Sequence, residues 1–187
     1  IPTENISKNM DDILSGNYVE DVRFLLEGQV IRDSESIFED YALNDIVIQK
    51  WNIAHLLELK TYINGTFVHT HRSDGMIVSS PTGSTAYALA GGGPVVQPEL
   101  DALLLVPICP HSLTNRPIVI DGDSSVEVVV TTRESDNARL AIDGEGKLEL
   151  ASNDRVKVSK KNKSIKLIHP PEHDQFHILR EKLNWST

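Results

Sequence analysis

The sequence is poor in cysteine, in basic residues and in long apolar runs, and each shortage excludes a class of protein. Its 187 residues include one cysteine, Cys109, so a single chain can form neither an internal disulfide nor a multi-cysteine metal cluster. No stretch reaches the ~18 apolar residues of a membrane-spanning helix. Lysine and arginine total 18 against 27 acidic residues, and the net charge of −9 disfavours a general nucleic-acid binder. We therefore expect a cytoplasmic protein that binds neither membranes nor nucleic acids and holds no metal of its own.

The overall composition is that of a folded globular protein. Hydrophobic residues make up 40% of the chain and charged residues 24%, far from the composition of disordered proteins. A chain of this length can bury one substantial core, so one main domain is expected. The sequence opens on Ile1 and Pro2 without an initiator methionine, and we interpret it as a fragment or a processed product.

Short apolar runs separated by turn residues predict a mainly β, sandwich-like fold with a few helices. Residues 57–63 alternate between apolar and polar up to Asn64-Gly65, and Phe67 begins a return strand, which is the strongest hairpin signal in the chain. The other predicted strands are residues 22–26, 46–48, 76–78, 103–106, 118–120, 126–130, 140–142, 148–150, 156–158 and 165–168.

Helices are expected mainly near the two ends of the chain. The spacing of apolar residues predicts an amphipathic helix over 3–15 and another over 176–183, and residues 85–90 are compatible with a third. We assign residues 1–170 to one β-rich domain with an N-terminal linking helix, and residues 171–187 to a C-terminal amphipathic helix.

Hydroxyls and glycines are concentrated in residues 73–93, where the sequence reads SDGMIVSSPTGSTAYALAGGG. Small residues let a ligand approach the backbone, and the amides at a helix start favour acceptor atoms and negative charge. A nucleotide would suit such a segment. The alternative is a hydroxyl-rich turn beside a glycine-lined packing contact, without any ligand.

The order of residues in this segment resembles the NAD kinase family: Asp-Gly, two apolar residues, Ser-x-Pro-Thr-Gly-Ser-Thr-Ala-Tyr, then Gly-Gly-Pro. Residues 42–45 resemble the Ala-x-Asn-Glu segment of that family, and residues 107–113 with Arg116-Pro117 match further downstream. The tail at 176–185 is similar to gamma-proteobacterial members. The chain is thus identified as similar to the C-terminal, NAD-binding part of a bacterial NAD kinase.

The resemblance implies which residues hold the substrate. Asn44 and Asp45 match the pair that holds hydroxyls of the adenosine ribose, although the family has Glu where this chain has the shorter Asp45. An amide and a carboxylate suit neighbouring hydroxyls, because the carboxylate accepts and the amide both donates and accepts. From the residues alone, the favoured interpretation is a turn-forming side chain for Asn44 and a solvated charge at a strand edge for Asp45.

The same resemblance places Thr85, Ala86 and Tyr87 around the adenine, with Thr82 on the loop beside it. Asp74 matches a carboxylate that contacts the nicotinamide end, and its alternative is a turn aspartate before glycine. Cys109 lies on a segment that, in tetramers of the family, helps to complete the site of a neighbouring subunit. The resemblance therefore implies a homo-oligomer, and a tetramer in particular.

NAD kinases also have an N-terminal Rossmann-like half with a Gly-Gly-Asp-Gly motif, whose aspartate activates the adenosine 2′-hydroxyl. Nothing in this chain matches it, because Gly122-Asp123 and Asp143-Gly144 are turn dipeptides between predicted strands. We therefore assign no catalytic residue to this chain and expect it to begin at about the domain boundary.

The resemblance implies a phosphotransferase that uses ATP, with Mg²⁺ or another divalent metal, to phosphorylate the 2′-hydroxyl of NAD and give NADP. The chain alone is expected to be inactive. The alternatives are a non-catalytic nucleotide-binding or oligomerisation module, and a lipid kinase of the wider superfamily, which the Thr-Gly-Ser-Thr-Ala-Tyr stretch disfavours.

Overall fold

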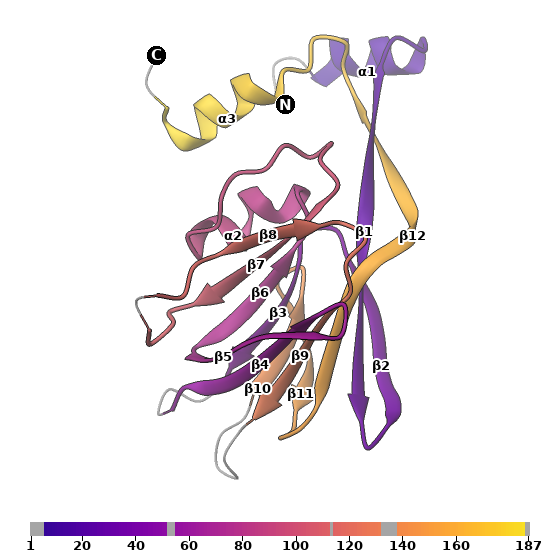
Figure 1. Ribbon diagram of the computed structural model, residues 1–187. Helices are drawn as coiled ribbons and strands as arrows, with labels where there is room; N and C mark the ends of the chain where they lie inside the picture. Colours follow the sequence, from indigo (N-terminus) through magenta and orange to yellow (C-terminus); the bar gives the residue numbers. More distant parts are fainter. Residues whose placement is uncertain (1–5, 52–54, 113, 132–137, 186–187) are drawn as a thin grey trace. The chain divides into compact units, whose positions relative to one another are not determined.

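The structure, a computed structural model, describes residues 6–51, 55–112, 114–131 and 138–185. Its strands form two six-stranded sheets (Figure 1). The first sheet has the order β2 (Glu35–Ala42), β1 (Val19–Arg32), β12 (Arg155–His169), β9 (Val126–Thr131), β4 (Leu57–Ile63) and β5 (Thr66–Ser73). The second has the order β11 (Glu145–Leu150), β10 (Ala138–Ile142), β3 (Asp45–Lys50), β6 (Gly75–Ser79), β7 (Ala102–Ile108) and β8 (Ile118–Asp121). The predicted mainly β, sandwich-like fold is therefore confirmed.

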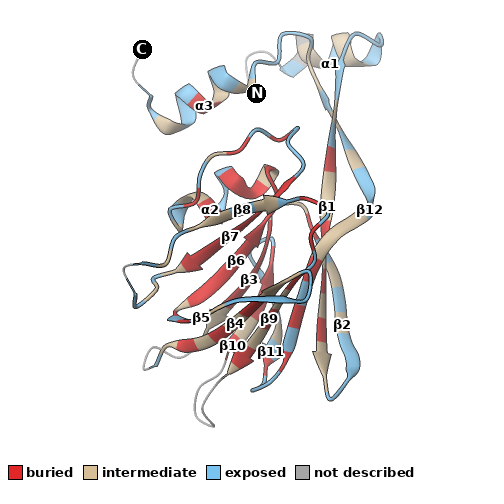
Figure 2. Ribbon diagram, in the orientation of Figure 1, coloured by how far each residue is buried: buried red, intermediate tan, exposed pale blue. Residues whose placement is uncertain are grey.

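Residues 23–164 form one compact unit, and its core lies between the two sheets. Alternate residues of each strand face this core, as expected for sheets with one face buried. Figure 2 shows the buried positions concentrated on the central strands. Fully buried members of the core from the first sheet include Leu26, Val30, Leu59, Val128 and Val156, and those from the second include Ile46, Ile48, Met76, Leu105 and Leu140.

The opposite face of the second sheet carries a smaller apolar cluster. Side chains of β3, β6, β7 and β10 meet Ala88 and Val96 there. Ala88 belongs to the short helix α2 (Tyr87–Ala90), which follows the 3₁₀ helix η2 (Thr82–Thr85). The cluster therefore packs the hydroxyl-rich segment onto the outer face of the second sheet.

The described parts of residues 1–22 and 165–187 form a second compact unit. It contains α1 (Ile6–Leu14) and α3 (Gln175–Leu183), at the positions where amphipathic helices were predicted. Asp174 caps α3, because its carboxylate accepts hydrogen bonds from the amides of Phe176 (2.9 Å) and His177 (3.1 Å). No helix in the described ranges is long and apolar enough to cross a membrane.

The hairpin predicted at Asn64-Gly65 is confirmed. Both residues have a positive φ (50° and 76°), and Ile63 pairs with Thr66 across the turn. A second hairpin joins β1 to β2 through Asp33-Ser34. Of this hairpin, the sequence predicts only a strand at residues 22–26. The helix compatible with residues 85–90 is interrupted, because Ala86 lies between η2 and α2 in a non-helical conformation.

Candidate functional site

A cleft of about 390 Å³ lies on the outer face of the second sheet, beside η2 and α2. Clefts of this size hold small organic ligands. Its lining combines polar side chains, an aromatic ring and an apolar floor. The lining residues are Asn44, Asp45, Val47, Gln49, Ala86, Tyr87, Ala141, Asp143 and Gly144.

Strand alternation explains which residues of β3 reach the cleft. Ile46 and Ile48 face the core between the sheets, so Asp45, Val47 and Gln49 face outward. Val47 pairs with Ala141 on the neighbouring strand β10. These two small apolar side chains form the floor, and polar groups stand at its ends.

The hydroxyl-rich segment is fastened to the Leu43-Asn44 turn that precedes β3. The Ser80 hydroxyl donates to the carbonyl of Leu43 (2.6 Å), and the Ser79 hydroxyl donates to the carbonyl of Asn44 (3.2 Å). A Cβ atom at Gly83 would overlap the carbonyl oxygen of Asn44, so only glycine permits this approach. The segment therefore presents Ala86 and Tyr87 to the same cleft as Asn44.

Asp143 fixes the same turn from the other side. Its carboxylate accepts hydrogen bonds from the amides of Leu43 (2.8 Å), Asn44 (2.8 Å) and Asp45 (3.1 Å). Its own amide donates to the carbonyl of Asp45 (3.0 Å). Asp143 and Gly144, with φ of 47° and 82°, form the two-residue turn between β10 and β11. The dipeptide is thus a turn, as predicted, and is also part of the cleft.

Asp45 is buried, with 3% of its surface exposed. Burial raises the pKa of its carboxyl to about 6, and the negative charge of Asp143 adds to the rise. A hydrogen bond from the Tyr87 amide acts in the opposite direction and lowers the pKa. The cleft therefore holds a carboxyl that titrates close to neutral pH, an arrangement common at functional sites.

The structure brings four of the predicted site residues together, namely Asn44, Asp45, Ala86 and Tyr87. Tyr87 is 42% exposed, so its ring is accessible to a ligand. Thr82 and Thr85 lie next to the cleft, on η2, and are not part of its lining. The Thr85 hydroxyl is 3.4 Å from the carbonyl oxygen of Thr82, to which it donates.

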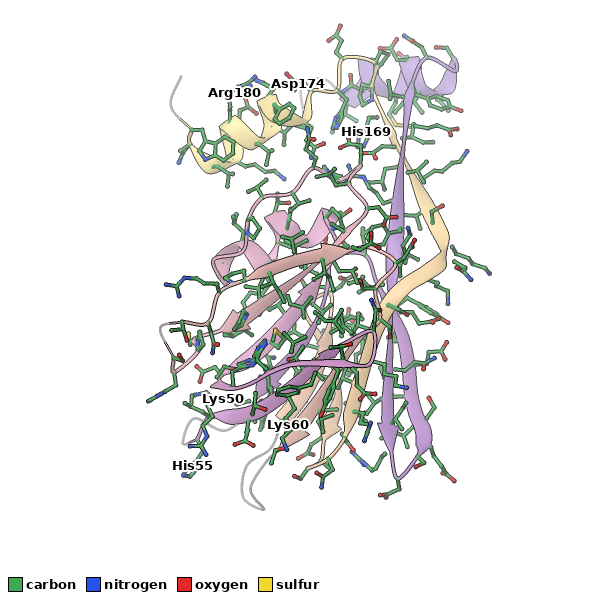
Figure 3. All side chains as sticks on the ribbon, viewed as in Figure 1. Lys50, His55, Lys60, His169, Asp174 and Arg180 are labelled. Atoms are coloured by element: carbon green, nitrogen blue, oxygen red, sulfur yellow. The ribbon has the colours of Figure 1, made fainter. Side chains whose placement is uncertain are left out.

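Asp74 and Cys109 lie outside the lining of this cleft. Asp74 occupies the turn between β5 and β6. Its carboxylate forms an ion pair with Lys50 (labelled in Figure 3) at 2.6 Å. The Asp74 amide donates to the carbonyl of Ile108 (2.9 Å), the residue before the exposed Cys109. Both residues therefore lie near the N-terminal end of β6, whereas η2 and α2 follow its C-terminal end.

Five cleft residues were not predicted as site residues: Val47, Gln49, Ala141, Asp143 and Gly144. Val47 and Gln49 could have been found by counting alternate positions from Asp45 along one strand. Asp143 carried a weaker signal, an Asp-Gly turn between two short apolar runs. Its contact with residues 43–45 joins segments about a hundred positions apart, and no local pattern indicates it.

A second hollow, of about 450 Å³, lies on the outer face of the first sheet beside Tyr62. Its two cations, Arg155 and Lys157, both engage Glu127, at 3.0 and 3.8 Å. Because one carboxylate already serves both cations, this hollow is less suited to a ligand than the cleft.

Known proteins with a similar sequence align with nearly the whole chain. A profile of the family described as the ATP-NAD kinase C-terminal domain matches residues 43–170. The NAD kinase of Thiobacillus denitrificans is 44% identical over 185 residues, which cover 99% of this chain and 63% of that protein. The NAD kinase of Pseudoalteromonas translucida is 42% identical, covering 98% of this chain and 63% of that protein. The chain thus spans less than two thirds of the length of these relatives.

Solved structures share the fold. A yeast NADH kinase, crystallised with NADH, superposes with a TM-score of 0.90 at 28% identity, covering 98% of this chain and 56% of that one. An NAD kinase from Archaeoglobus fulgidus, crystallised with ATP, gives a TM-score of 0.74 at 23% identity, covering 98% of this chain and 68% of that one. At that identity the second comparison shows similarity of fold alone.

Proposed function

The chain belongs to the ATP-NAD kinase C-terminal domain family, and on this premise we propose that its cleft binds the adenosine part of NAD. In this proposal the chain supplies the NAD-binding part of an NAD kinase. The observation that carries it is the cleft itself, in which an amide, a buried carboxylate and an accessible tyrosine ring surround an apolar floor.

Each group in the cleft suits one part of adenosine. Asn44 and Asp45 would hold the neighbouring hydroxyls of the ribose, since an amide and a carboxylate together accept and donate. Tyr87 would cover the adenine with its ring, and Ala86 would contact it through the backbone. Asp143 holds the Leu43-Asn44 turn by three amides and so would keep the ribose-binding pair in place.

In the proposed reaction the 2′-oxygen of NAD forms a bond to the γ-phosphorus of ATP. The bond from that phosphorus to the bridging oxygen breaks, ADP leaves, and the hydroxyl proton passes to a base. Mg²⁺ or another divalent ion would enter with ATP, as part of the substrate. Within the described ranges no group of three or more His, Cys, Asp or Glu residues is placed to hold a metal ion.

The remaining predicted residues take roles outside the adenosine cleft. Asp74 would face the nicotinamide end, and Thr82 and Thr85 would border the nucleotide along η2. Cys109 would lie at a contact with a neighbouring subunit of a cytoplasmic homotetramer. Light scattering of the complete protein tests the assembly, since a strictly monomeric mass would contradict it.

Calorimetric titration of the complete protein with NAD, together with an assay for NADP formation from NAD and ATP, tests the proposal. We expect the unmodified protein to bind NAD and to form NADP. Tyr87→Ala should bind NAD about tenfold more weakly, because it removes the aromatic contact. Tyr62→Ala, on the other sheet, is the matched control and should bind NAD normally. Unchanged NAD affinity in Tyr87→Ala would contradict the proposal that this cleft binds the adenosine part of NAD. Binding without NADP formation by the complete protein would favour the non-catalytic nucleotide-binding module.

A further inference from the structure

Arg23, on β1, is a buried cation that contacts Thr82 of the hydroxyl-rich segment. Only 7% of its surface is exposed. Its guanidinium donates a hydrogen bond to the Thr82 hydroxyl, at 3.1 Å between Nη1 and Oγ1. A buried charge is costly unless it is paired and hydrogen-bonded, and among the bonds that hold Arg23 this one joins the cation directly to the first residue of η2.

Thr82 differs from the serines around it. The hydroxyls of Ser79, Ser80 and Ser84 donate to main-chain carbonyls of Asn44, Leu43 and Val96 and so fasten the segment to its surroundings. The Thr82 hydroxyl instead accepts from a charged donor, which gives a stronger hydrogen bond than a neutral one.

Thr82 is the first residue of η2, and no side chain caps that helix. From Thr82 a series of contacts leads to the cleft. The carbonyl of Thr82 accepts the Thr85 hydroxyl (3.4 Å), and the carbonyl of Gly83 accepts the Ala86 amide (2.9 Å). The next amide, that of Tyr87, donates to the carboxylate of Asp45.

We propose that Arg23 is a positioning residue for nucleotide binding, which acts through Thr82 to hold η2 and thereby places Ala86 and Tyr87 at the cleft. Arg23 does not line the cleft, so its effect on the ligand is indirect. The proposal rests on the proposed function, since it assigns the held segment to NAD.

The test compares Arg23→Gln, Thr82→Val, the double variant and the conservative Thr82→Ser in the complete protein. Arg23 has further contacts, so its single substitution also removes those. The coupling energy between the Arg23 and Thr82 substitutions isolates the contribution of the hydrogen bond between the two residues. We expect each of the first two variants to weaken NAD binding about tenfold, the double variant to be no weaker than Arg23→Gln, and Thr82→Ser, which keeps the hydroxyl, to restore most of the affinity that Thr82→Val loses. Should Arg23→Gln not fold, the two Thr82 variants still decide whether the hydroxyl is needed.

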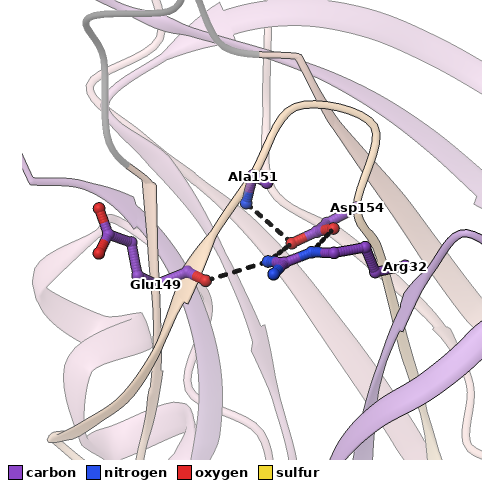
Figure 4. Close-up of polar contacts among 4 residues, drawn as sticks. All are labelled: Arg32, Glu149, Ala151 and Asp154. Carbon is purple, nitrogen blue, oxygen red and sulfur yellow. Dashed lines mark hydrogen bonds and ion pairs between the residues drawn. The ribbon is translucent and has the colours of Figure 1, made fainter.

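Arg32 offers a matched control on the same strand. Its guanidinium bonds both carboxylate oxygens of the buried Asp154, at 2.8 and 2.7 Å (Figure 4). It lies nine positions further along the strand than Arg23, about 30 Å away. Arg32→Gln should therefore lower the melting temperature and leave the NAD dissociation constant unchanged.

A measurement without ligand separates this proposal from the proposed function. The amides of Ser84 and Ala86 donate within the segment, to Pro81 and Gly83. Their hydrogen exchange should speed up in Arg23→Gln and Thr82→Val and stay unchanged in Arg32→Gln. If the unmodified protein binds NAD and the two substitutions act independently, or exchange is unchanged, the proposal for Arg23 is overturned alone. If the unmodified protein fails to bind NAD, the proposed function is overturned, and with it the nucleotide-binding role of Arg23.

Discussion

Asp45 holds a carboxylate in an enclosed position next to a second carboxylate, and this arrangement costs stability. Its folded pKa, about 6, lies above the ordinary aspartate value of 3.8, so the folded state binds the proton more tightly than the unfolded state does. The free energy of unfolding therefore decreases as pH rises from about 4 through 6, and the full cost is present above neutral pH. The cleft therefore maintains a charged acceptor at the expense of fold stability, a trade-off typical of functional sites.

Asp45→Asn should separate these two effects. At pH 7.5 we expect the free energy of unfolding to rise by about 1–3 kcal/mol, because the buried charge is removed. NAD binding should weaken, since the ribose loses its charged acceptor. Urea unfolding at several pH values measures the first effect and calorimetry the second. A stability gain that persisted unchanged down to pH 4 would show that the charge is not its cause.

His71 gives the opposite pH dependence. It is buried, and within the described part of the chain neither ring nitrogen has a hydrogen-bond partner. Burial first, and then the neighbouring His69, whose ring centroid lies 4.8 Å away, together lower its pKa from 6.5 to about 4. The unfolded state then binds more protons between these values, so stability falls as pH drops from about 6.5 toward 4.

We expect the unmodified protein to lose about 1 kcal/mol relative to His71→Leu between pH 7.5 and 5.5. Urea unfolding of both proteins at the two pH values gives this difference, and the contribution of Asp45 cancels because both contain it. His111→Gln, at an exposed position, is the control and should follow the unmodified protein. Parallel pH profiles for His71→Leu and the unmodified protein would mean that His71 is protonated without cost.

Some residues of the site could be predicted from the sequence and others could not. Asn44, Ala86 and Tyr87 lie in runs that resemble the NAD kinase family, and the structure places them in one cleft. The sequence predicts Asp143 as an ordinary turn residue. Its carboxylate accepts hydrogen bonds from three amides on a neighbouring part of the sheet, and the local sequence does not indicate these contacts. The ion pair between Asp74 and Lys50 also depends on strand pairing, which local sequence does not specify.

At the scale of elements, the β10–β11 turn has two roles, since it closes a hairpin and holds the turn before β3. Asp143→Ala removes three amide contacts and leaves a non-glycine residue with positive φ. We expect a loss of about 2–3 kcal/mol in unfolding free energy and weaker NAD binding, because the Asn44 backbone loosens. Denaturant melts and calorimetry measure the two effects.

Asp33→Ala provides the comparison, because Asp33 also has a positive φ, 50°, in a hairpin turn. Its turn joins β1 to β2 and is not part of the cleft lining. Asp33→Ala should cost less stability and leave NAD affinity unchanged. Equal effects of the two substitutions on affinity would mean that Asp143 has no special role at the site.

The elements that were missed share a physical cause. β1 continues through the polar stretch Glu27-Gly28-Gln29, and β12 through residues 159–164, so apolar runs mark only parts of each strand. The expected helix over 85–90 is interrupted because the Ala86 amide bonds to Gly83 in the 3₁₀ pattern. Backbone hydrogen bonds decide these cases, the pairing with β2 for residues 27–29 and the Ala86–Gly83 bond for residues 85–90, and hydrophobic periodicity does not report them.

For the whole molecule, the class of fold followed from the sequence and the strand order did not. Regularly spaced apolar runs require two faces that bury each other, which predicts a sandwich. The order of each sheet depends on pairings such as β3 with β6 and β10, far apart along the chain. Such non-local pairings are set by packing of the complete core and leave little trace in any one segment.

The proposed division of labour predicts that this 187-residue chain binds NAD and forms no NADP. Two carboxyls stand in the cleft, but Asp143 accepts three amides, and the proposal assigns Asp45 to the ribose as an acceptor that holds its hydroxyls, so neither is assigned as the base. General-base assistance contributes about 10²–10⁴-fold, and the donor phosphates need a separate cradle, so without both turnover should fall below detection.

The measurement is a coupled assay for NADP with NAD, ATP and Mg²⁺, on this chain and on the complete protein at equal concentration. Circular dichroism and calorimetric binding of NAD establish first that the chain is folded and its cleft intact. We expect NADP from the complete protein alone. NADP formation by the chain itself would contradict the division of labour and direct attention to Asp45. Asp45→Asn in the chain, assayed at saturating NAD, would then decide, since loss of that activity with NAD bound would identify its carboxylate, with a pKa of about 6, as the base.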